Sequence, residues 1–457
     1  MANRLPVSRV RLDDPDEDGA GFGWETSPGG LVSALSPILR SRTGAWVGWS
    51  GDAGEAPRPF RHDDIDLEPV SLSADELERF YLGFSNSTIW PLYHDSVRFP
   101  EFKRSWWRTY VEVNRRFAEA AARTLESGGT AWIHDYQLQL VPDMLRELRP
   151  AARIGFFDHI PFPPVELFAQ LPWRRQILEG LLGADLVGFQ TELGRANFVA
   201  AAERWTDAKE VDGHLERRGR RIETRAFPIT IDHRRFAEIA QRPAVVRRAR
   251  EIRENLGPER RILLGVDRLD YTKGIDKRLK AMVTLLEGRE RHGRDPILVQ
   301  IAVPSRELIP DYAEIRERVE AQVGQINGMF AGLGRAAVEY HYQSVPVEEL
   351  VAWYRAADVM TVTPLRDGMN LVAKEFVAAR TDGDGVLVLS EFCGAARELR
   401  GGLLVNPHDV DGMAATFERA LAMDEHERRD RMEALRAVVT SSDVFDWADA
   451  FLGALRG

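Results

Sequence analysis

The segment VDRLDYTKGIDKR, residues 266–278, places cations and a glycine where an expected strand gives way to a helix. Arg268 and Lys273 lie in the connecting loop, next to Gly274. A diphosphate is bound by such a combination, because cations supply charge, glycine lets the backbone approach and helix N-terminal amides donate hydrogen bonds. The pattern by itself also fits a solvated Arg/Lys pair on a surface turn.

A second loop of this kind follows in TPLRDGMNLVAKEFVAA, residues 363–379. The Asp367–Gly368 turn precedes a helix expected to begin at Leu371, whose first amides could hold a phosphate. Asp367 can accept hydrogen bonds from sugar hydroxyls, and Glu375 could bind a ribose diol. The alternative is that Asp367 caps the helix and that Glu375 is a surface residue.

Polar side chains also end two expected strands in the first half of the chain. The segments AWIHDYQL (131–138) and IGFFDHIPFPP (154–164) carry chemistry-bearing groups that could come together: His134, Asp135, Asp158 and His159. The same half contains the aromatic residues Trp49, Tyr81 and Trp90. Aromatic faces pack on the C–H faces of sugars, but they are also ordinary core, which is the simpler interpretation here.

The elements that must position these residues alternate along the chain. Short apolar runs separated by amphipathic segments are typical of parallel sheets with helices on both faces, which is the doubly wound α/β pattern. The expected strands are 131–134, 154–157, 186–189, 225–229, 262–266, 297–302, 359–363 and 386–389. The expected helices are 104–125, 174–182, 193–205, 346–356 and 371–379.

The pattern indicates two α/β halves that would enclose a cleft. We expect an N-terminal domain over 1–235, a C-terminal domain over 236–440 and a terminal helix over 441–457 that returns to the N-terminal domain. Residues 1–4 leave little room for the buried strand that opens a doubly wound domain. Either this first strand is very short or the start lies upstream.

Composition narrows the functional classes. Lys+Arg number 61 and Asp+Glu 71, a net charge of −10, which argues against a nucleic-acid partner. Cys393 is the single cysteine, so an intramolecular disulfide and a cysteine-based metal site are excluded. No apolar stretch approaches the roughly 18 residues of a membrane span. We therefore expect a cytoplasmic enzyme without a membrane or nucleic-acid partner.

Ordered motifs over nearly the whole chain resemble the trehalose-6-phosphate synthase family of retaining GT-B glycosyltransferases. They are NRLPVS, SPGGLVSAL, GAWVGWSG, WIHDYQLQLVP, FFDHIPFP, GADLVGFQT, VDRLDYTKGID, TPLRDGMNLVAKE and LSEFCGAARE. Members of this family transfer glucose from a nucleotide-glucose to glucose 6-phosphate. The resemblance thus implies a GT-B fold with two facing Rossmann-like domains and this activity.

The resemblance also assigns roles by position. It implies that the catalytic residues are Arg268, Lys273, His159 and Asp367. The implied donor-binding residues are Gly30, Arg268, Lys273, Asp367, Gly368, Met369, Asn370, Leu371, Val372 and Glu375. The implied acceptor-binding residues are Arg4, Trp49, Tyr81, Trp90, Asp135 and Arg306, with Arg4, Tyr81 and Arg306 on the acceptor phosphate.

In this family the donor phosphate deprotonates the acceptor hydroxyl as the glycosidic bond breaks, so neither a carboxylate nucleophile, a metal nor a cofactor is implied. The implied partners are UDP- or GDP-glucose, glucose 6-phosphate and further copies of the chain. Asp158 departs from the family, which has an apolar residue there. Two alternatives stay open: a synthase with glycerol 3-phosphate or a cyclitol phosphate as acceptor, and a catalytically silent sugar-phosphate-binding homologue.

Overall fold

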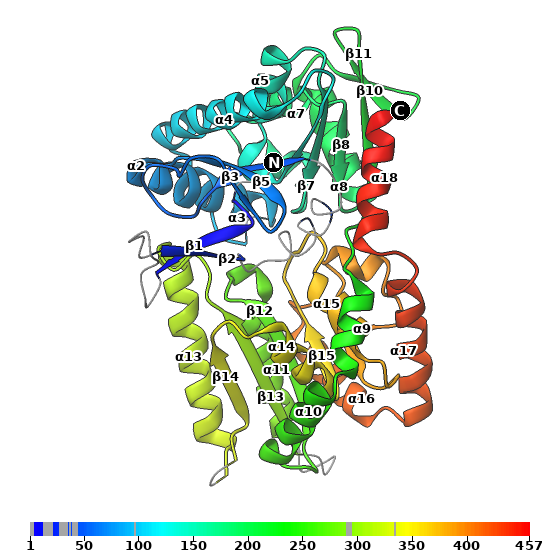
Figure 1. Ribbon diagram of the computed structural model, residues 1–457. Helices are drawn as coiled ribbons and strands as arrows, with labels where there is room; N and C mark the ends of the chain where they lie inside the picture. The colour runs from blue at the N-terminus through cyan, green and yellow to red at the C-terminus, as the bar shows by residue number, and fades with distance from the viewer. Residues whose placement is uncertain are drawn as a thin grey trace. The chain divides into compact units, whose positions relative to one another are not determined.

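The computed structural model describes residues 4–11, 22–26, 35, 38, 44–95, 97–288, 295–332 and 335–457. The chain forms two compact units (Figure 1). Unit 1 comprises Met1–Pro228 and Phe445–Gly457, and unit 2 comprises Ile229–Val444. The acceptor-binding and donor-binding assignments of the domains 1–235 and 236–440 stay predictions.

Unit 1 is built on a sheet with the strand order β6-β7-β8-β11-β10-β9 among the described residues. The first four strands are parallel, the first three of them mostly buried as their continuous apolar runs predict, and β10 and β9 extend the sheet as an antiparallel hairpin. The bounds are β6 (Thr130–His134), β7 (Arg153–Asp158), β8 (Leu186–Phe189), β9 (Lys209–Val211), β10 (His214–Arg217) and β11 (Arg220–Ala226).

Helices and two small sheets complete unit 1. The small sheets consist of β1 (Val7–Arg11) with β2 (Phe22–Thr26), and of β3 (Ala45–Trp49), β5 (Ile65–Val70) and β4 (Phe60–His62). The helices are α2 (Ala74–Glu76), the π-helix η1 (Leu77–Ile89), α3 (Trp90–Tyr93), α4 (Arg104–Thr124), η2 (Tyr136–Leu138), α5 (Val141–Leu148), α6 (Val165–Phe168), α7 (Arg174–Leu181) and α8 (Glu192–Trp205).

The last helix, α18 (Val444–Arg456), packs on the parallel strands of unit 1 (Figure 1). Its Phe451 ring lies against β7 and β8 at two glycines: a Cβ at Gly155 or Gly188 would come within 2.7 Å of this ring. Trp447 donates a hydrogen bond from Nε1 to the Phe227 carbonyl at 3.0 Å. The glycines therefore make room for the helix, and the indole fixes its position.

Unit 2 contains a fully parallel sheet, whose order is β14-β13-β12-β15-β16-β17 within the described part of the chain. The order reverses between β12 and β15, which makes their carboxyl ends the switch point where ligands bind in open α/β sheets. The bounds are β12 (Arg261–Arg268), β13 (Pro296–Val303), β14 (Val338–Tyr342), β15 (Val359–Val362), β16 (Val386–Ser390) and β17 (Leu403–Val405).

Helices enclose the sheet of unit 2. One core joins the sheet to α11 (Ile275–Glu287), α13 (Pro310–Phe330) and α16 (Val410–Ala422) through buried residues such as Met282, Val319 and Phe417. The other helices are α9 (His233–Gln241), α10 (Pro243–Leu256), α14 (Val347–Ala356), α15 (Leu371–Ala379) and α17 (Glu425–Val439), with the short turns η3 (Tyr271–Lys273) and η4 (Gly394–Arg397).

Most of the expected elements are present with shifted ends, and one strand prediction is wrong. The strand expected at 225–229 is β11, which spans Arg220–Ala226 and pairs with β8 in its second half. Its first half, RRIET, pairs with the hairpin strand β10 and alternates partly exposed with buried side chains, so no continuous apolar run marks it. No helix among the described residues is long and apolar enough to cross a membrane.

Candidate active site

The loop after β12 has the geometry of an anion-binding turn. Gly274 adopts φ +66° directly before α11, and a Cβ there would come within 2.4 Å of the Thr363 carbonyl oxygen, so only glycine fits. The carboxylate of Asp270 accepts hydrogen bonds from the amide and the hydroxyl of Thr272, both at 2.9 Å. The loop is thus held from within and stands at the N-terminus of a helix of 13 residues.

The two loops singled out by the sequence meet at the carboxyl edge of the sheet. The amide of Leu365 donates to the Thr272 carbonyl at 2.7 Å. Lys273 Nζ lies 2.6 Å from Asp367 Oδ2, and both side chains are largely buried. The structure therefore brings together two of the predicted donor-binding residues, Lys273 and Asp367, as an ion pair.

The N-terminus of α15 supplies amides beside this ion pair. Asn370 has φ +79° and caps the helix, since its side-chain oxygen accepts from the Ala373 amide at 3.3 Å. Asn370 Nδ2 also donates to Asp367 Oδ2 at 3.2 Å. The cap is therefore Asn370 and not Asp367, so Asp367 is placed for contact with a ligand next to the first-turn amides of Leu371 and Val372.

Glu375 lies one turn into α15 and is fixed by a tyrosine. Tyr354 donates its hydroxyl to Glu375 Oε2 at 2.9 Å. Burial raises the pKa of this carboxyl, and the hydrogen bond from Tyr354 counteracts the rise. The tyrosine holds one oxygen, and the other oxygen is the one that would accept from a ribose hydroxyl.

A buried arginine supports both loops from below. Arg278 is 0% exposed, and its NH1 donates to Asp267 Oδ2 and to Gln300 Oε1, each at 2.6 Å. Its Nε donates to Thr363 Oγ1 at 3.1 Å. One side chain from α11 thus ties the end of β12 to the residue that follows β15. The sequence reasoning did not find this role, although an arginine on the apolar side of a helix is its signal.

Arg306, predicted to bind the acceptor phosphate, lies in unit 2 beside the same loop. Its NH1 is 3.2 Å from Asp270 Oδ2, and Tyr312 donates to that oxygen at 2.9 Å. Burial by itself would raise the pKa of Asp270, but Arg306, Arg268 and Lys273 outweigh it and lower the pKa to about 2. Asp270 therefore stays ionised and fixes the cations around it, a role that the sequence reasoning missed although RLDYTKG contains this residue.

Arg268 is the exposed last residue of β12. Its charge reaches Asp270, as the lowered pKa of that carboxyl shows. The cationic group at this edge thus includes Arg268, Lys273 and Arg306, with two carboxylates among them. A diphosphate would meet charge from these cations and amides from α15 and from the turn before α11.

In unit 1, three predicted acceptor-binding residues form one cluster. The Arg4 guanidinium carbon lies 4.9 Å from the Trp49 ring centroid and 5.5 Å from that of Tyr81. The Arg4 backbone is fixed through its carbonyl, which accepts from Trp46 Nε1 at 2.8 Å. The exposed guanidinium can hold a phosphate, whereas the Trp49 ring is 1% exposed and packs against the arginine.

The remaining unit 1 candidates lie deeper. Trp90 is 4% exposed and contacts His94 at a centroid distance of 4.1 Å, and its acceptor-binding role stays a prediction. Asp135 has φ +76°, and its amide donates to the Phe157 carbonyl at 2.8 Å. His159 Nε2 lies 3.1 Å from His134 Nδ1. Burial lowers the pKa of His159 to about 3, which keeps the ring neutral.

Asp158 is buried at the end of β7 without a cation beside it. It is 1% exposed, and burial together with the charge of Asp135 raises its pKa well above the ordinary value. Burial of this carboxyl thus favours its neutral form. Burial, with a smaller contribution from Asp158, also raises the pKa values of the Tyr93 and Tyr110 hydroxyls.

Backbone strain marks three of the predicted residues. Asp135, Asn370 and Arg306 all have positive φ, a conformation that persists in a non-glycine residue only where the surroundings impose it. Gly30 lies outside the described residues. No group of three or more His, Cys, Asp or Glu side chains in the described ranges could hold a metal ion.

Two doubly wound α/β units, one with a cationic loop and a helix N-terminus at its switch point, define a GT-B glycosyltransferase. The family model of glycosyltransferase family 20 matches residues 1–456. The chain belongs to this family.

Individual relatives and solved structures agree. Trehalose-6-phosphate synthase of Mycobacterium sp. (strain KMS) is 54% identical over 464 residues, which cover 100% of this chain and 94% of the relative. The Burkholderia xenovorans α,α-trehalose-phosphate synthase in complex with glucose-6-phosphate superposes with a TM-score of 0.90, 34% identity and coverage of 100% and 99%. The E. coli structure bound with UDP-2-fluoro glucose superposes with a TM-score of 0.89 and is 36% identical, with coverage of 94% of this chain and 97% of that structure.

Proposed function

We propose that this chain transfers glucose with retention from a nucleotide-glucose to glucose 6-phosphate, giving α,α-trehalose 6-phosphate and a nucleoside diphosphate. The observation that carries the proposal is the joined pair of loops in unit 2, where Lys273 and Asp367 lie 2.6 Å apart beside the N-terminus of α15. The full-length likeness to synthases that bind glucose-6-phosphate and a UDP-glucose analogue supports the two substrates.

In the proposed reaction, Arg268 and Lys273 bind the diphosphate, and the amides of Gly368, Met369, Leu371 and Val372 face it. Asp367 accepts from hydroxyls of the transferred glucose, and Glu375 accepts from the ribose. The bond from C1 to the donor phosphate breaks, and the bond from C1 to the acceptor oxygen forms on the same face. The acceptor hydroxyl gives its proton to the departing phosphate oxygen.

The chain's own contribution is positioning and charge. The leaving diphosphate gains negative charge as the bond breaks, and the cations held by Asp270 and Asp367 are in place before the reaction. On the acceptor side, Arg4 with Trp49 and Tyr81 binds the phosphate of glucose 6-phosphate, with Asp135 on its hydroxyls. Gly30, Trp90, His159 and Arg306 keep their predicted roles within this proposal.

Substrate choice is tested by assaying UDP-, GDP- and ADP-glucose against glucose 6-phosphate and glycerol 3-phosphate, with products identified by mass. We expect a disaccharide phosphate from glucose 6-phosphate. A glucosylated glycerol phosphate as the main product would instead support the other acceptor class. Donor binding without any product would identify a silent homologue. A cytoplasmic location and a homo-oligomeric state stay predictions.

A further inference from the structure

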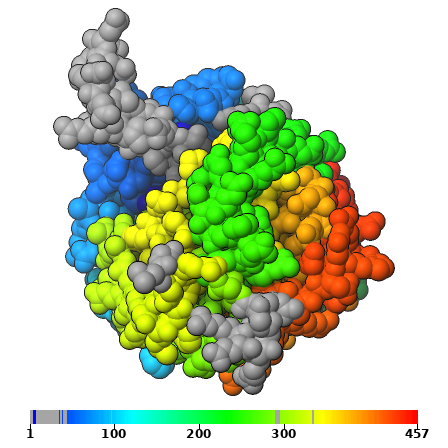
Figure 2. Space-filling model, turned by 90° about the horizontal axis from the view of Figure 1, so that it is seen from below, coloured from blue at the N-terminus to red at the C-terminus, as the bar shows by residue number. Residues whose placement is uncertain are grey.

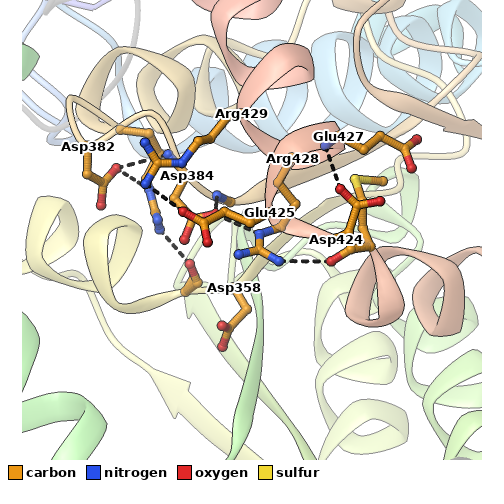
Figure 3. Close-up of polar contacts among 12 residues, drawn as sticks. Asp358, Asp382, Asp384, Asp424, Glu425, Glu427, Arg428 and Arg429 are labelled. Carbon is orange, nitrogen blue, oxygen red and sulfur yellow. Dashed lines mark hydrogen bonds and ion pairs between the residues drawn. The ribbon is translucent and has the colours of Figure 1, made fainter.

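A cavity of about 300 Å³ lies in unit 2, away from the loops described above (Figure 3). It lies at the amino ends of the strands, since Arg261 begins β12, Asp358 directly precedes β15 and Asp384 stands two residues before β16. The diphosphate-binding loops follow the carboxyl ends of β12 and β15. The cavity is therefore at the opposite edge of the same sheet and belongs to a different site.

Arginines dominate the lining of this cavity. Its charged residues are the arginines 253, 261, 355, 380 and 428 and the aspartates 358, 382 and 384, an excess of two positive charges. They come from the three helices α10, α14 and α17, from the segment after α15 and from the ends of β12, β15 and β16. In Figure 2, α10 is seen in green and α17 in orange-red on the same face of unit 2.

Three of the five arginines donate to backbone carbonyls. Arg380 donates from NH1 to the carbonyls of Tyr354, Arg355 and Ala357, and Arg253 donates to that of Ala356 at 2.5 Å. These carbonyls end α14, where the last turn lacks helical partners, so Arg253 and the buried Arg380 cap a helix C-terminus. Arg428 donates from NH1 to the Met423 carbonyl at 2.8 Å after α16 and keeps its other nitrogens on the cavity side chains.

The acidic residues of the lining are already paired. Asp358 lies 3.2 Å from Arg253 and 2.9 Å from Arg261. Asp382 pairs with Arg380 at 3.0 Å, and Asp384 pairs with Arg428 at 2.7 Å. Asp358 thus serves two arginines at once, and it also accepts from the Ile262 amide at 2.8 Å.

Arg355 contacts a neutral hydroxyl next to the lining rather than an aspartate of the lining. Its NH1 donates to the Thr381 hydroxyl at 3.1 Å. The acids of α17 that lie nearest in Figure 3 are engaged elsewhere: Glu425 pairs with Arg429 at 2.8 Å, and Asp424 caps the helix through the Glu427 amide. The acids around the cavity therefore do not balance the excess charge of its arginines.

We propose that this cavity is a second anion site, which binds a phosphate dianion through Arg355, Arg261 and Arg428. Guanidinium groups bind phosphate oxygens in pairs, and a dianion would balance the two excess charges. A cavity of about 300 Å³ is at the small end of ligand sites, which suits orthophosphate or the phosphate monoester of a small polyol. In the second case Asp382 and Asp384 would accept from the hydroxyls.

Calorimetric titration of the protein with orthophosphate and, separately, with glycerol 2-phosphate tests the proposal. Saturating UDP is present throughout to occupy the diphosphate loops. We expect one further anion to bind, with affinity reduced at least tenfold in Arg355→Gln and unchanged in the acceptor-site variant Arg4→Gln. Tighter binding of the ester than of orthophosphate would assign the site to a polyol phosphate, and the reverse to free phosphate.

Two results would overturn the proposal: no binding of either anion under these conditions, or binding that is lost in Arg4→Gln and retained in Arg355→Gln. Arg355→Gln removes one contact to a hydroxyl, so the variant should fold and keep the activity of the parent chain. Crystals soaked with tungstate give an independent measurement, with an anomalous peak expected between Arg355 and Arg428. A peak confined to the Arg268 loop would contradict the proposal.

Discussion

The carboxyl edges of the two large sheets differ in whether their titratable side chains have partners of opposite charge. In unit 2, two carboxylates pair with cations, Asp270 with Arg306 at 3.2 Å and Asp367 with Lys273 at 2.6 Å, whereas Glu375 is held by the Tyr354 hydroxyl. In unit 1, Asp158, His134 and His159 are buried without an opposite charge, and burial shifts their pKa values toward the neutral forms. The comparison teaches that one edge is built for an ionic ligand and the other for neutral hydroxyls.

The cation predicted to bind the acceptor phosphate in unit 1 is Arg4, which contacts aromatic rings. Arg4 is exposed and is placed over the rings of Trp49 and Tyr81 rather than beside a carboxylate. A phosphorylated sugar could thus be bound at its charged end by one residue and along its ring by neutral ones. A nucleotide diphosphate needs charge along its whole bridge, which the ion-paired loops of unit 2 provide.

The largest expected effect is on kcat, when a cation of the loop after β12 in unit 2 is removed. Arg268→Ala or Lys273→Ala should lower kcat about 100- to 1,000-fold, because the leaving diphosphate would lose a preorganised charge partner. Steady-state kinetics with saturating substrates measures this loss. Lys280→Ala, an exposed cation on α11, is the matched control and should behave like the parent chain. Near-normal turnover of both loop variants would refute their role.

Arg4→Gln, in unit 1, should weaken the binding of the acceptor. The charged hydrogen bonds of one arginine to a phosphate contribute about 1.5–3 kcal/mol, so KM for glucose 6-phosphate should rise roughly 10- to 100-fold. KM for the nucleotide-glucose should stay within about twofold. Arg58→Gln, an exposed arginine elsewhere in unit 1, controls for a general loss of positive charge. A donor KM that rises with the acceptor KM would show that the edges are not separate.

Because burial keeps His159 neutral in the folded protein, we expect the protein to lose stability in mild acid. An unfolded histidine binds a proton below about pH 6.5, whereas His159 has a folded pKa of about 3. The unfolded state therefore takes up protons first, and stability that is full above pH 6.5 is lost as the pH falls toward 3. At pH 5 this group alone costs about 2 kcal/mol relative to pH 7.5.

Urea unfolding of the parent chain and of His159→Asn at the two pH values measures this dependence. The variant should lose about 2 kcal/mol less between pH 7.5 and 5. His408→Asn changes an exposed histidine and should keep the dependence of the parent chain. An unchanged pH dependence in His159→Asn would mean that this ring is not held neutral.

The smallest effect is expected at Asp158. Because burial raises the pKa of this carboxyl and so favours its neutral form, Asp158→Asn introduces a neutral group of nearly the same shape, and stability should change by less than about 1 kcal/mol. Asp158→Leu should leave activity intact or raise it. A change of acceptor preference in either variant, measured with glucose 6-phosphate and glycerol 3-phosphate, would show instead that Asp158 reads the acceptor.

Apolar runs predicted the parallel strands well, because strands buried on both faces leave a continuous signal in the sequence. The hairpin β9–β10 and the polar half of β11 carried no such signal, and their pairing depends on exposed residues such as Arg221. The two cationic loops were located from residue type and spacing. Arg278 and Asp270 lie in the same motif, but their roles were missed because the contacts of Arg278 with Thr363 and of Asp270 with Arg306 join segments far apart in the sequence.

The separation of charge between the two edges is tested most directly by binding measurements on two variants. UDP and glucose 6-phosphate are titrated calorimetrically into Lys273→Ala and Arg4→Gln. We expect Lys273→Ala to lose most of its affinity for UDP and to keep its affinity for glucose 6-phosphate. We expect Arg4→Gln to keep its affinity for UDP and to lose most of its affinity for glucose 6-phosphate. Loss of both ligands in a single variant that is folded, or of neither ligand in both, would contradict this separation of charge.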